Sequence, residues 1–334
     1  MATGTTLYSA GGISPRTNVW AAQEMLAYAM PVIVLDKFGV TKPMPKNKTQ
    51  TIKFRRPKVF TAADTPLTEG VTPSSTQFSY EDVSATLKQY GQVVTITDVI
   101  EDTHEDPVLQ DATQQCGDNI GRTIEKLTYG VLKAGTNVFY TTGAARASVG
   151  DPISLSKQRA VTRALKAQKA RKINRMLSPS VDYGTRAVEA CYPAVAHTDM
   201  ESDIRILPGF TKVSEYGQRK PICYEEIGSV EDVRYVLSPD LDSFADAGAA
   251  TSTMVTTGGT SADVYPVLFF GKEAYATIPL RGMGSVEPVI IPTSQRDKSD
   301  PLGQRGHVGW KTYFVAKILN ELWMARLESA ATAL

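Results

Sequence analysis

Histidine and acidic side chains are the first groups to consider for chemistry, because they supply many metal ligands and most general acids and bases. The chain contains only three histidines: His104, His197 and His307. His197 begins the string HTDMESD, in which acidic residues follow at two-residue intervals. His197, Asp199 and Glu201 therefore form a candidate ligand set for a metal-dependent enzyme. Acids in the first turn of a helix capped by Thr198 or Asp199 would give the same string.

A second acidic cluster, EDTHEDP at residues 101–107, gathers four carboxylates and a histidine. A cation site there would need oxygens that converge on one point, whereas the helix dipole favours acids ahead of a helix without any ligand. We predict the helix-terminal role. The sequence contains no Walker loop, no G-x-S-x-G, no H-E-x-x-H and no paired C-x-x-C. We therefore expect no catalytic constellation, no bound metal and no cofactor.

Basic side chains gather in two segments. Residues 46–58 read as a strand whose cations would contact phosphates or an acidic face of a neighbouring subunit. A predicted helix over 157–175 is the better candidate for loose contact with a polyanion, and a solvated helix face is its alternative. Few aromatic residues are interleaved with the cations, so sequence-specific nucleic-acid recognition is not expected. The candidate DNA-facing residues of the helix are Lys157, Arg159, Arg163 and Lys166.

The composition is that of an ordinary globular protein. The chain has 334 residues, enough for about two domains. Its 36 Lys and Arg nearly balance 35 Asp and Glu, and 42% of the residues are hydrophobic, which excludes a disordered chain, a collagen-like fibre and a strongly basic nucleic-acid wrapper. No apolar run reaches the roughly 18–20 residues of a membrane-spanning helix, and no signal peptide is visible. Three widely spaced cysteines indicate buried thiols in a reducing compartment.

The first hundred residues predict an arm, a helix and a protruding hairpin. Residues 1–16 are small and polar, which indicates a flexible arm, and a helix is expected from Val19 to about Met30. The segment TQTIKFRRPKVF alternates as a half-exposed strand, and SATLKQYGQVVTITDVI returns as a second strand with Gly91 as a bulge candidate. A long polar loop joins them. Because such a hairpin has little core of its own, we expect it to rest on something outside its own domain.

The strongest local signal is a long amphipathic helix over residues 106–135. Asp106 occupies the N-cap position, Pro107 the first helical position and Gly135 the position just past the end. A helix of about 27 residues would be roughly 40 Å long and would act as a spine. The apolar residues that recur every four positions are Val108, Ala112, Cys116, Ile120 and Ile124.

The remainder predicts mixed α and β structure. Short strands are expected at CYPAVAH, VEDVRYVL and VYPVLFFG, a helix at TDMESDIRIL and an exposed loop at DAGAATSTMVTTGGTSAD. The C-terminal run WKTYFVAKILNELWMARLESAATA fits either a helix or two strands joined by a turn at Asn320 and Glu321. Its β-rich composition favours the hairpin.

These elements, in this order, resemble the major capsid proteins of tailed bacteriophages, which have the HK97-type shell fold. The resemblance covers residues 13–334, except for an uninformative insertion at 249–262. The strings that resemble one podophage-like capsid family are GISPRTNVWAAQEML, PKNKTQTIKFRR, TPLTEGVTPS, QYGQVVTITDVIEDTHEDPVL, YGVLKAGTNVFY, FADAG, KSDPLGQRGHVGWKTYF and LWMARLESAATA.

The resemblance implies an α+β fold with four parts. Residues 1–18 would be the N-terminal arm and 42–97 the extended E-loop. The peripheral (P) domain would hold the spine helix and the axial (A) domain would be residues 190–300. The resemblance also supports the C-terminal hairpin, because the family places long strands there. The segments implied for the P domain are 19–41, 98–189 and 301–334.

The function implied is the assembly of a shell and not catalysis. Copies would form the pentamers and hexamers of an icosahedral virion capsid around double-stranded DNA, assembled in the host cytoplasm with portal, scaffold and decoration proteins as partners. No membrane partner is implied. An encapsulin-like compartment is the alternative within the same fold, and a metal-dependent enzyme is the alternative of another class. Each E-loop would lie across a neighbouring subunit, with contacts from Ile52, Lys53, Phe54, Arg55, Arg56 and Glu69.

The near-zero net charge suits a subunit that packs against copies of itself, because like charges would repel. The total does not show that basic and acidic residues are concentrated in different segments. Segments 42–58 and 157–175 are basic, whereas 101–106 and 199–203 are acidic. We expect these opposite patches to meet across subunit boundaries.

Overall fold

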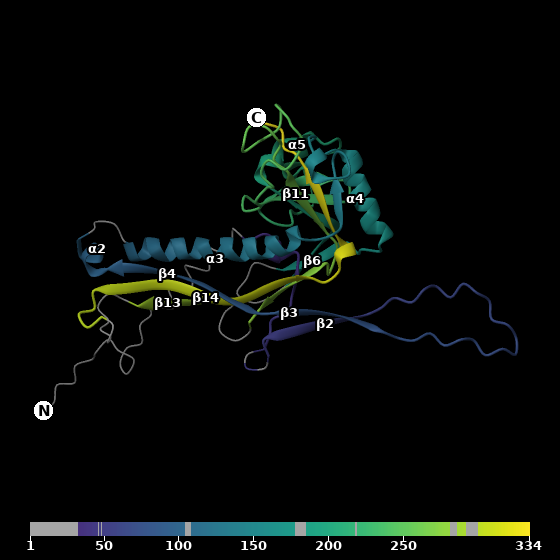
Figure 1. The fold of residues 1–334 in the computed structure, drawn as a ribbon, viewed down its shortest axis with the longest axis horizontal. Helices are drawn as coiled ribbons and strands as arrows, with labels where there is room; N and C mark the ends of the chain where they lie inside the picture. Colours follow the sequence, from purple (N-terminus) through teal and green to yellow (C-terminus); the bar gives the residue numbers. More distant parts are fainter. Residues whose placement is uncertain are drawn as a thin grey trace.

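The computed structural model describes residues 33–334 except 46, 48, 104–107, 178–184, 218, 281–285 and 292–299. The predicted N-terminal arm and the helix from Val19 therefore lie outside the described residues. The described chain forms an elongated layer of one long helix on a sheet, a second and larger sheet with short helices, and an arm that projects from the body (Figure 1).

The predicted spine helix is present as α3 (Val108–Lys133), with the short α2 (Asp98–Thr103) before it. One face of α3 packs on strand β14 (Arg305–Ile318), where Cys116, Ile120 and Ile124 meet Trp310 and other apolar side chains of the strand. The recurrence of apolar residues every three to four positions places them on this face. Gly135 follows the helix, and its N–H donates to the Leu132 carbonyl at 3.1 Å. The helix is confirmed over Val108–Lys133, whereas the predicted cap at Asp106 and Pro107 lies outside the described residues.

A five-stranded sheet lies beneath the spine helix. Strand β14 is long enough to pair on one side with β12 (Tyr275–Pro279) and β13 (Val286–Ile291) and on the other with β4 (Lys88–Thr97). The short β1 (Val40–Thr41) adds to β12 in parallel. Gly91 was expected to form a bulge, and this is wrong, since the β4–β14 register is continuous through it.

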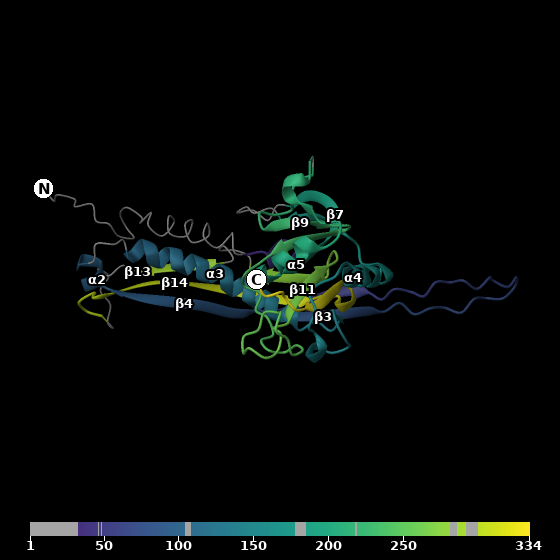
Figure 2. The same ribbon diagram turned by 90° about the horizontal axis from the view of Figure 1, so that it is seen from above.

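The protruding hairpin is confirmed. Strands β2 (Thr51–Pro57) and β3 (Tyr80–Thr86) pair antiparallel, and loop 58–79 extends far beyond the body (Figure 1). The returning segment is two strands and not one. Buried Leu87 separates β3, which stays in the hairpin, from β4, which enters the five-stranded sheet. We call residues 51–86 the arm. Figure 2 shows it continuing in line with β4.

An eight-stranded sheet forms the larger core. Its central strand β11 (Tyr265–Phe270) is buried on both faces, with Val267 and Phe269 in one apolar cluster and Leu268 and Phe270 in another. A strand buried on both faces reads as a continuous apolar run, as the VYPVLFFG string does. The order is β5 (Val138–Tyr140), β15 (Met324–Ser329), β11, β7 (Thr185–Ala196), β10 (Val233–Leu237), β9 (Glu226–Val230) and β8 (Thr211–Lys212), with β6 (Ile173–Leu177) paired to β7.

Short helices cover this sheet. The basic helix is present as α4 (Leu155–Ala167) and ends earlier than expected, because Lys169 takes a left-handed conformation with φ of 57° and the chain turns into β6. The predicted acidic helix is present as α5 (Glu201–Ile206) after the 3-10 turn η3 (Thr198–Met200). The other 3-10 turns are η1 (Leu35–Lys37), η2 (Arg146–Ser148), η4 (Val213–Glu215) and η5 (Glu321–Trp323).

The C-terminal run forms two strands as expected, but they do not pair with each other. β14 belongs to the five-stranded sheet, and β15 lies between β11 and β5 in the eight-stranded sheet. Turn η5, in which the Asn320 side chain accepts the Leu322 N–H at 3.2 Å, carries the chain from one sheet to the other. The hairpin interpretation was wrong, since β15 pairs with β11 at one edge and with β5 at the other, which leaves no edge for β14.

The sheets also cross the expected domain limits. β12 and β13 come from residues 190–300 but pair with β14, whereas β15 and β5, expected in the P domain, join the larger sheet. The loop at 246–263 is held at both ends, since the Asp263 carboxylate accepts the Asp246 N–H at 2.8 Å and the Thr257 N–H at 3.2 Å.

Candidate assembly surfaces

The base of the arm is attached to the subunit's own five-stranded sheet. Ile52 and Phe54 point to the same side of β2 and pack against Met44, Leu87 and Ile278. This packing within the subunit leaves both side chains half-buried. The contact with a neighbouring subunit that was expected of these two side chains stays a prediction.

The arginines of the arm are paired within it. Arg55 Nε and Nη2 donate to Asp82 at 2.8 and 3.0 Å, and the hydrogen bond from Arg55 holds the pKa of Asp82 below its usual value. Arg56 donates twice to Glu81, at 2.7 and 2.9 Å. Because each pair lies directly opposite across the β2–β3 ladder, the carboxylates expected on a neighbour are supplied by the same hairpin.

Two predicted contact residues of the arm keep an available charge. Lys53 is exposed opposite Ser84, and Glu69 is exposed in the long loop. Neither makes a salt bridge with the described part of the chain. Any charged contact that the arm makes elsewhere would therefore rest on these two groups more than on the arginines.

The arm also presents an apolar surface that the sequence analysis missed, because these side chains are dispersed in a polar loop rich in Thr, Ser and Pro. Phe78 packs edge-on against Tyr80, with ring centroids 4.7 Å apart, and lies 5.9 Å from Phe60. A projecting loop has no core of its own to cover such groups, and contiguous exposed apolar surface marks interaction sites. The exposed apolar side chains are Val59, Phe60, Leu67, Val71, Phe78 and Tyr80.

A second apolar surface lies at the other end of the molecule. Val93 and Val94, which face opposite sides of β4, and Val99 and Ile100 at the start of α2, are exposed. β4 pairs only with β14, so its outer edge is open in the described chain. Figure 1 places α2 and the tip of the arm at opposite ends of the long axis. Two different apolar surfaces at opposite ends suit a head-to-tail contact between copies.

The basic helix does not present its four candidate cations equally. Arg159 donates to Glu231 at 2.5 and 2.8 Å, and Lys166 donates to Asp232 at 2.6 Å, both in the turn between β9 and β10. This hydrogen bond raises the pKa of Lys166 and lowers that of Asp232. Lys157 and Arg163 make no salt bridge within the described residues. Two of the four predicted DNA-facing cations are thus neutralised within the subunit.

The three proposed metal ligands do not converge, since His197 Nδ1 and Asp199 Oδ2 lie 3.2 Å apart but Glu201 is directed elsewhere. His197 Nδ1 accepts the Asp199 N–H at 3.1 Å and caps η3, and Asp199 accepts the Tyr265 hydroxyl at 2.7 Å. Glu201 instead pairs with Arg205 one turn along α5. The acidic residues lie in the first turns of η3 and α5 as expected, but the capping residue is His197 and not Thr198 or Asp199. Among the described residues, no group of three His, Cys, Asp or Glu side chains is placed to hold a metal ion.

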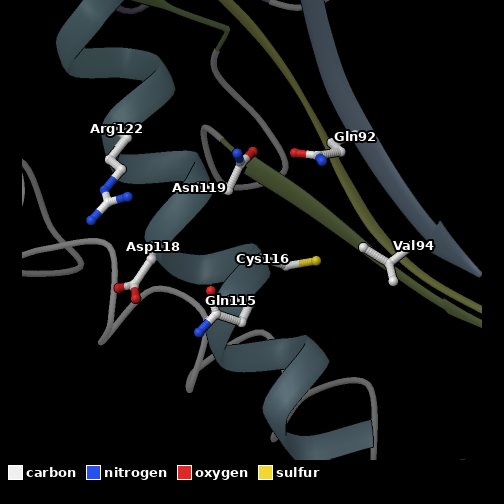
Figure 3. Close-up of a pocket in the computed structure, with 7 residues that line it drawn as sticks. All are labelled: Gln92, Val94, Gln115, Cys116, Asp118, Asn119 and Arg122. Atoms are coloured by element: carbon white, nitrogen blue, oxygen red, sulfur yellow. The ribbon is translucent and has the colours of Figure 1, made fainter. Parts of the chain in front are cut away.

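A groove of about 350 Å³ lies between β4 and α3 (Figure 3). Its walls carry three amides together with the charged Asp118 and Arg122, and Asn119 Oδ1 accepts the Trp310 indole N–H at 3.2 Å. The Cys116 thiol has its pKa raised by burial, so no activated nucleophile lines the groove. The lining residues are Gln92, Val94, Gln115, Cys116, Asp118, Asn119 and Arg122.

All three cysteines, Cys116, Cys191 and Cys223, are buried and free. This agrees with the prediction of buried thiols without a disulfide framework. In the described part of the chain, no helix has the length and apolar character needed to cross a bilayer.

Comparison with known proteins identifies the family to which the chain is similar. A family model described as "Phage capsid protein" matches residues 80–327. The major capsid protein of Pseudomonas phage KPP21 is 20% identical over 177 residues, a match that covers 49% of this chain and 45% of that protein's length.

Solved structures extend the likeness to the whole fold. The capsid of Ralstonia phage GP4 is similar with a TM-score of 0.63 at 13% identity, over 92% of this chain and 91% of that chain. The capsid of cyanophage Pam1 is similar with a TM-score of 0.62 at 15% identity, over 92% and 93% of the two chains. The expected α+β capsid fold is confirmed, and the chain belongs to the phage capsid protein family.

Proposed function

We propose that this capsid protein is the repeating subunit of a closed virion shell, built from pentamers and hexamers around double-stranded DNA in the host cytoplasm. Portal and scaffold proteins are the further partners that this role requires, and no catalytic step belongs to it. The observation that carries the proposal is the arm, whose loop 58–79 is exposed along its whole length although it bears Phe60, Leu67 and Phe78.

The proposed contact is repeated and directional. The apolar loop of one arm covers exposed apolar surface on the next copy, for which Val93 and Val99 at the far end of the body are candidates. Burial of apolar surface contributes about 25 cal/mol for each Å² removed from water. Because the two surfaces differ, each copy offers one and receives the other, and the ring closes when the rotation between copies allows it.

Replacing residues 60–78 with a short glycine-serine linker tests this proposal. These residues bury no side chain in the body, so the variant should keep the melting temperature of the wild-type subunit but form no closed shells in electron micrographs. A matched control that changes Thr72, Ser74 and Ser75 to alanine keeps the apolar set and should assemble normally. Closed shells of normal size from the linker variant would refute the role given to the arm.

A further inference from the structure

Two buried carboxyl groups, those of Glu125 and Asp36, lie at turn η1, in the segment that leads toward the arm. Glu125 on the spine helix has no exposed surface. Its Oε2 accepts the Val34 N–H at 3.1 Å, and its two oxygens accept the Leu35 N–H at 3.2 and 3.1 Å. It therefore closes the N-terminus of η1 from outside that turn, in the way a capping residue does.

Asp36 lies in the same turn and has an incomplete set of partners. Its side chain is hydrogen-bonded to Thr277 of β12, but its Oδ1 atom is inaccessible and has no hydrogen-bond partner in the described chain. An ionised carboxylate buried with an unused oxygen is costly, and a protonated carboxyl is the usual remedy. The burial of Asp36 and its unpartnered Oδ1 atom therefore favour the protonated carboxyl.

The charges around the pair do not neutralise it. Lys37 is the only cation of η1, and its Nζ is already paired with Glu225 at 2.8 Å. From β12, the Tyr275 hydroxyl donates to the Leu35 carbonyl, and burial raises the pKa of this phenol well above its usual value. The Cys223 thiol beside Lys37 and Glu225 also has its pKa raised by burial, to about 12. Both groups stay neutral near pH 7.

We propose that Asp36 and Glu125 form a proton-holding carboxyl pair, which keeps one proton at neutral pH and whose full ionisation loosens residues 34–41 from the spine helix. The pair lies in the segment that connects the body to the arm. Residues 40–41 form β1 on β12, and the chain then continues toward β2 at the base of the arm. The protonation state of the pair therefore sets how firmly the entry to the arm is held.

The direction of the pH dependence follows from burial. Burial raises the pKa of Glu125 to about 8, against the opposing hydrogen bonds from Leu35 and Val34, and burial also raises the pKa of Asp36. An acid whose pKa is higher in the closed state than in the open state stabilises the closed state below the open-state value. This stability is lost as the pH rises toward about 8.

Hydrogen exchange of the full-length protein between pH 5 and 8 tests the pair. After correction for intrinsic exchange rates, the protection of the Val34 and Leu35 amides should fall by up to about tenfold for each pH unit, as loss of one linked proton requires. The double variant Asp36→Asn with Glu125→Gln should show no fall. Asp36→Asn alone, which keeps the Glu125 cap, should show a smaller fall than the wild type.

Asp111→Asn is the matched control, because Asp111 is an exposed carboxylate of the same helix. It should keep the wild-type pH dependence. Protection that does not change with pH in the wild type would overturn the proposal. An equal fall in the wild type and Asp36→Asn would overturn it as well, and this single variant decides the question if the double variant does not fold.

Discussion

Glu328 on β15 is a carboxylate without exposed surface that its neighbours neutralise. Arg146 donates to it at 2.7 and 2.8 Å, and Arg326 Nε lies 3.0 Å from Oε1. The Arg146 guanidinium also stacks on Phe244, 3.4 Å from the ring centroid. Such a network adds little net stability when complete, but it becomes costly when one partner is removed.

Glu328→Gln should therefore lower the free energy of unfolding by roughly 3–5 kcal/mol, because two partly buried guanidinium groups lose their counter-charge. Chemical denaturation of the unassembled subunit measures this loss. Glu231→Gln is the matched control, since it breaks the solvent-exposed pair with Arg159 and should leave the midpoint nearly unchanged. Equal shifts in the two variants would contradict the role given to burial.

At the scale of elements, the β4–β14 pair depends on two glycines that let the strands approach. A Cβ on Gly309 would lie 2.6 Å from the Gln92 carbonyl oxygen, and one on Gly91 would lie 2.6 Å from the Trp310 carbonyl oxygen. Both contacts are with backbone, so no side chain can move away to make room.

Gly309→Ala should destabilise the subunit by about 1–3 kcal/mol, because the added methyl group separates the strands. Gly130→Ala is the opposite case. Gly130 is an exposed residue of α3 with nothing within 4 Å of an added Cβ, so alanine should stabilise the helix by about 1 kcal/mol. Thermal unfolding of both variants measures the difference, and a stabilised Gly309→Ala protein would show that the strands separate without cost.

Elements with local signals were predictable from the sequence, and their partners were not. The spine helix was predictable because Val108, Cys116 and Ile120 recur at helical spacing and Gly135 ends the pattern. The strands β14 and β15 were also expected, but their assignment to different sheets depends on distant residues such as Phe269. The same holds for Glu125, whose carboxylate caps a turn 90 residues away.

At the scale of the whole molecule, the charge balance arises largely within the subunit. Arg55, Arg56, Arg159 and Lys166 were expected to reach other molecules, yet each pairs with a carboxylate of this chain. No pattern in the sequence pairs residues so far apart as Lys166 and Asp232. On the arm, the surface left for contact with other molecules is therefore more apolar than the sequence indicated.

The same pairing decides which cations of α4 remain for DNA. If this helix faces the packaged genome, as predicted from the sequence, Lys157 and Arg163 make the phosphate contacts and Arg159 and Lys166 contribute less. Lys157→Gln with Arg163→Gln should lower the slope of log affinity for duplex DNA against log salt by about 1.8, since each phosphate contact contributes about 0.9. Arg159→Gln with Lys166→Gln is the matched control, and it should change the slope less because Glu231 and Asp232 already neutralise these cations. Equal slopes for both double variants and the wild type would show that α4 does not face DNA.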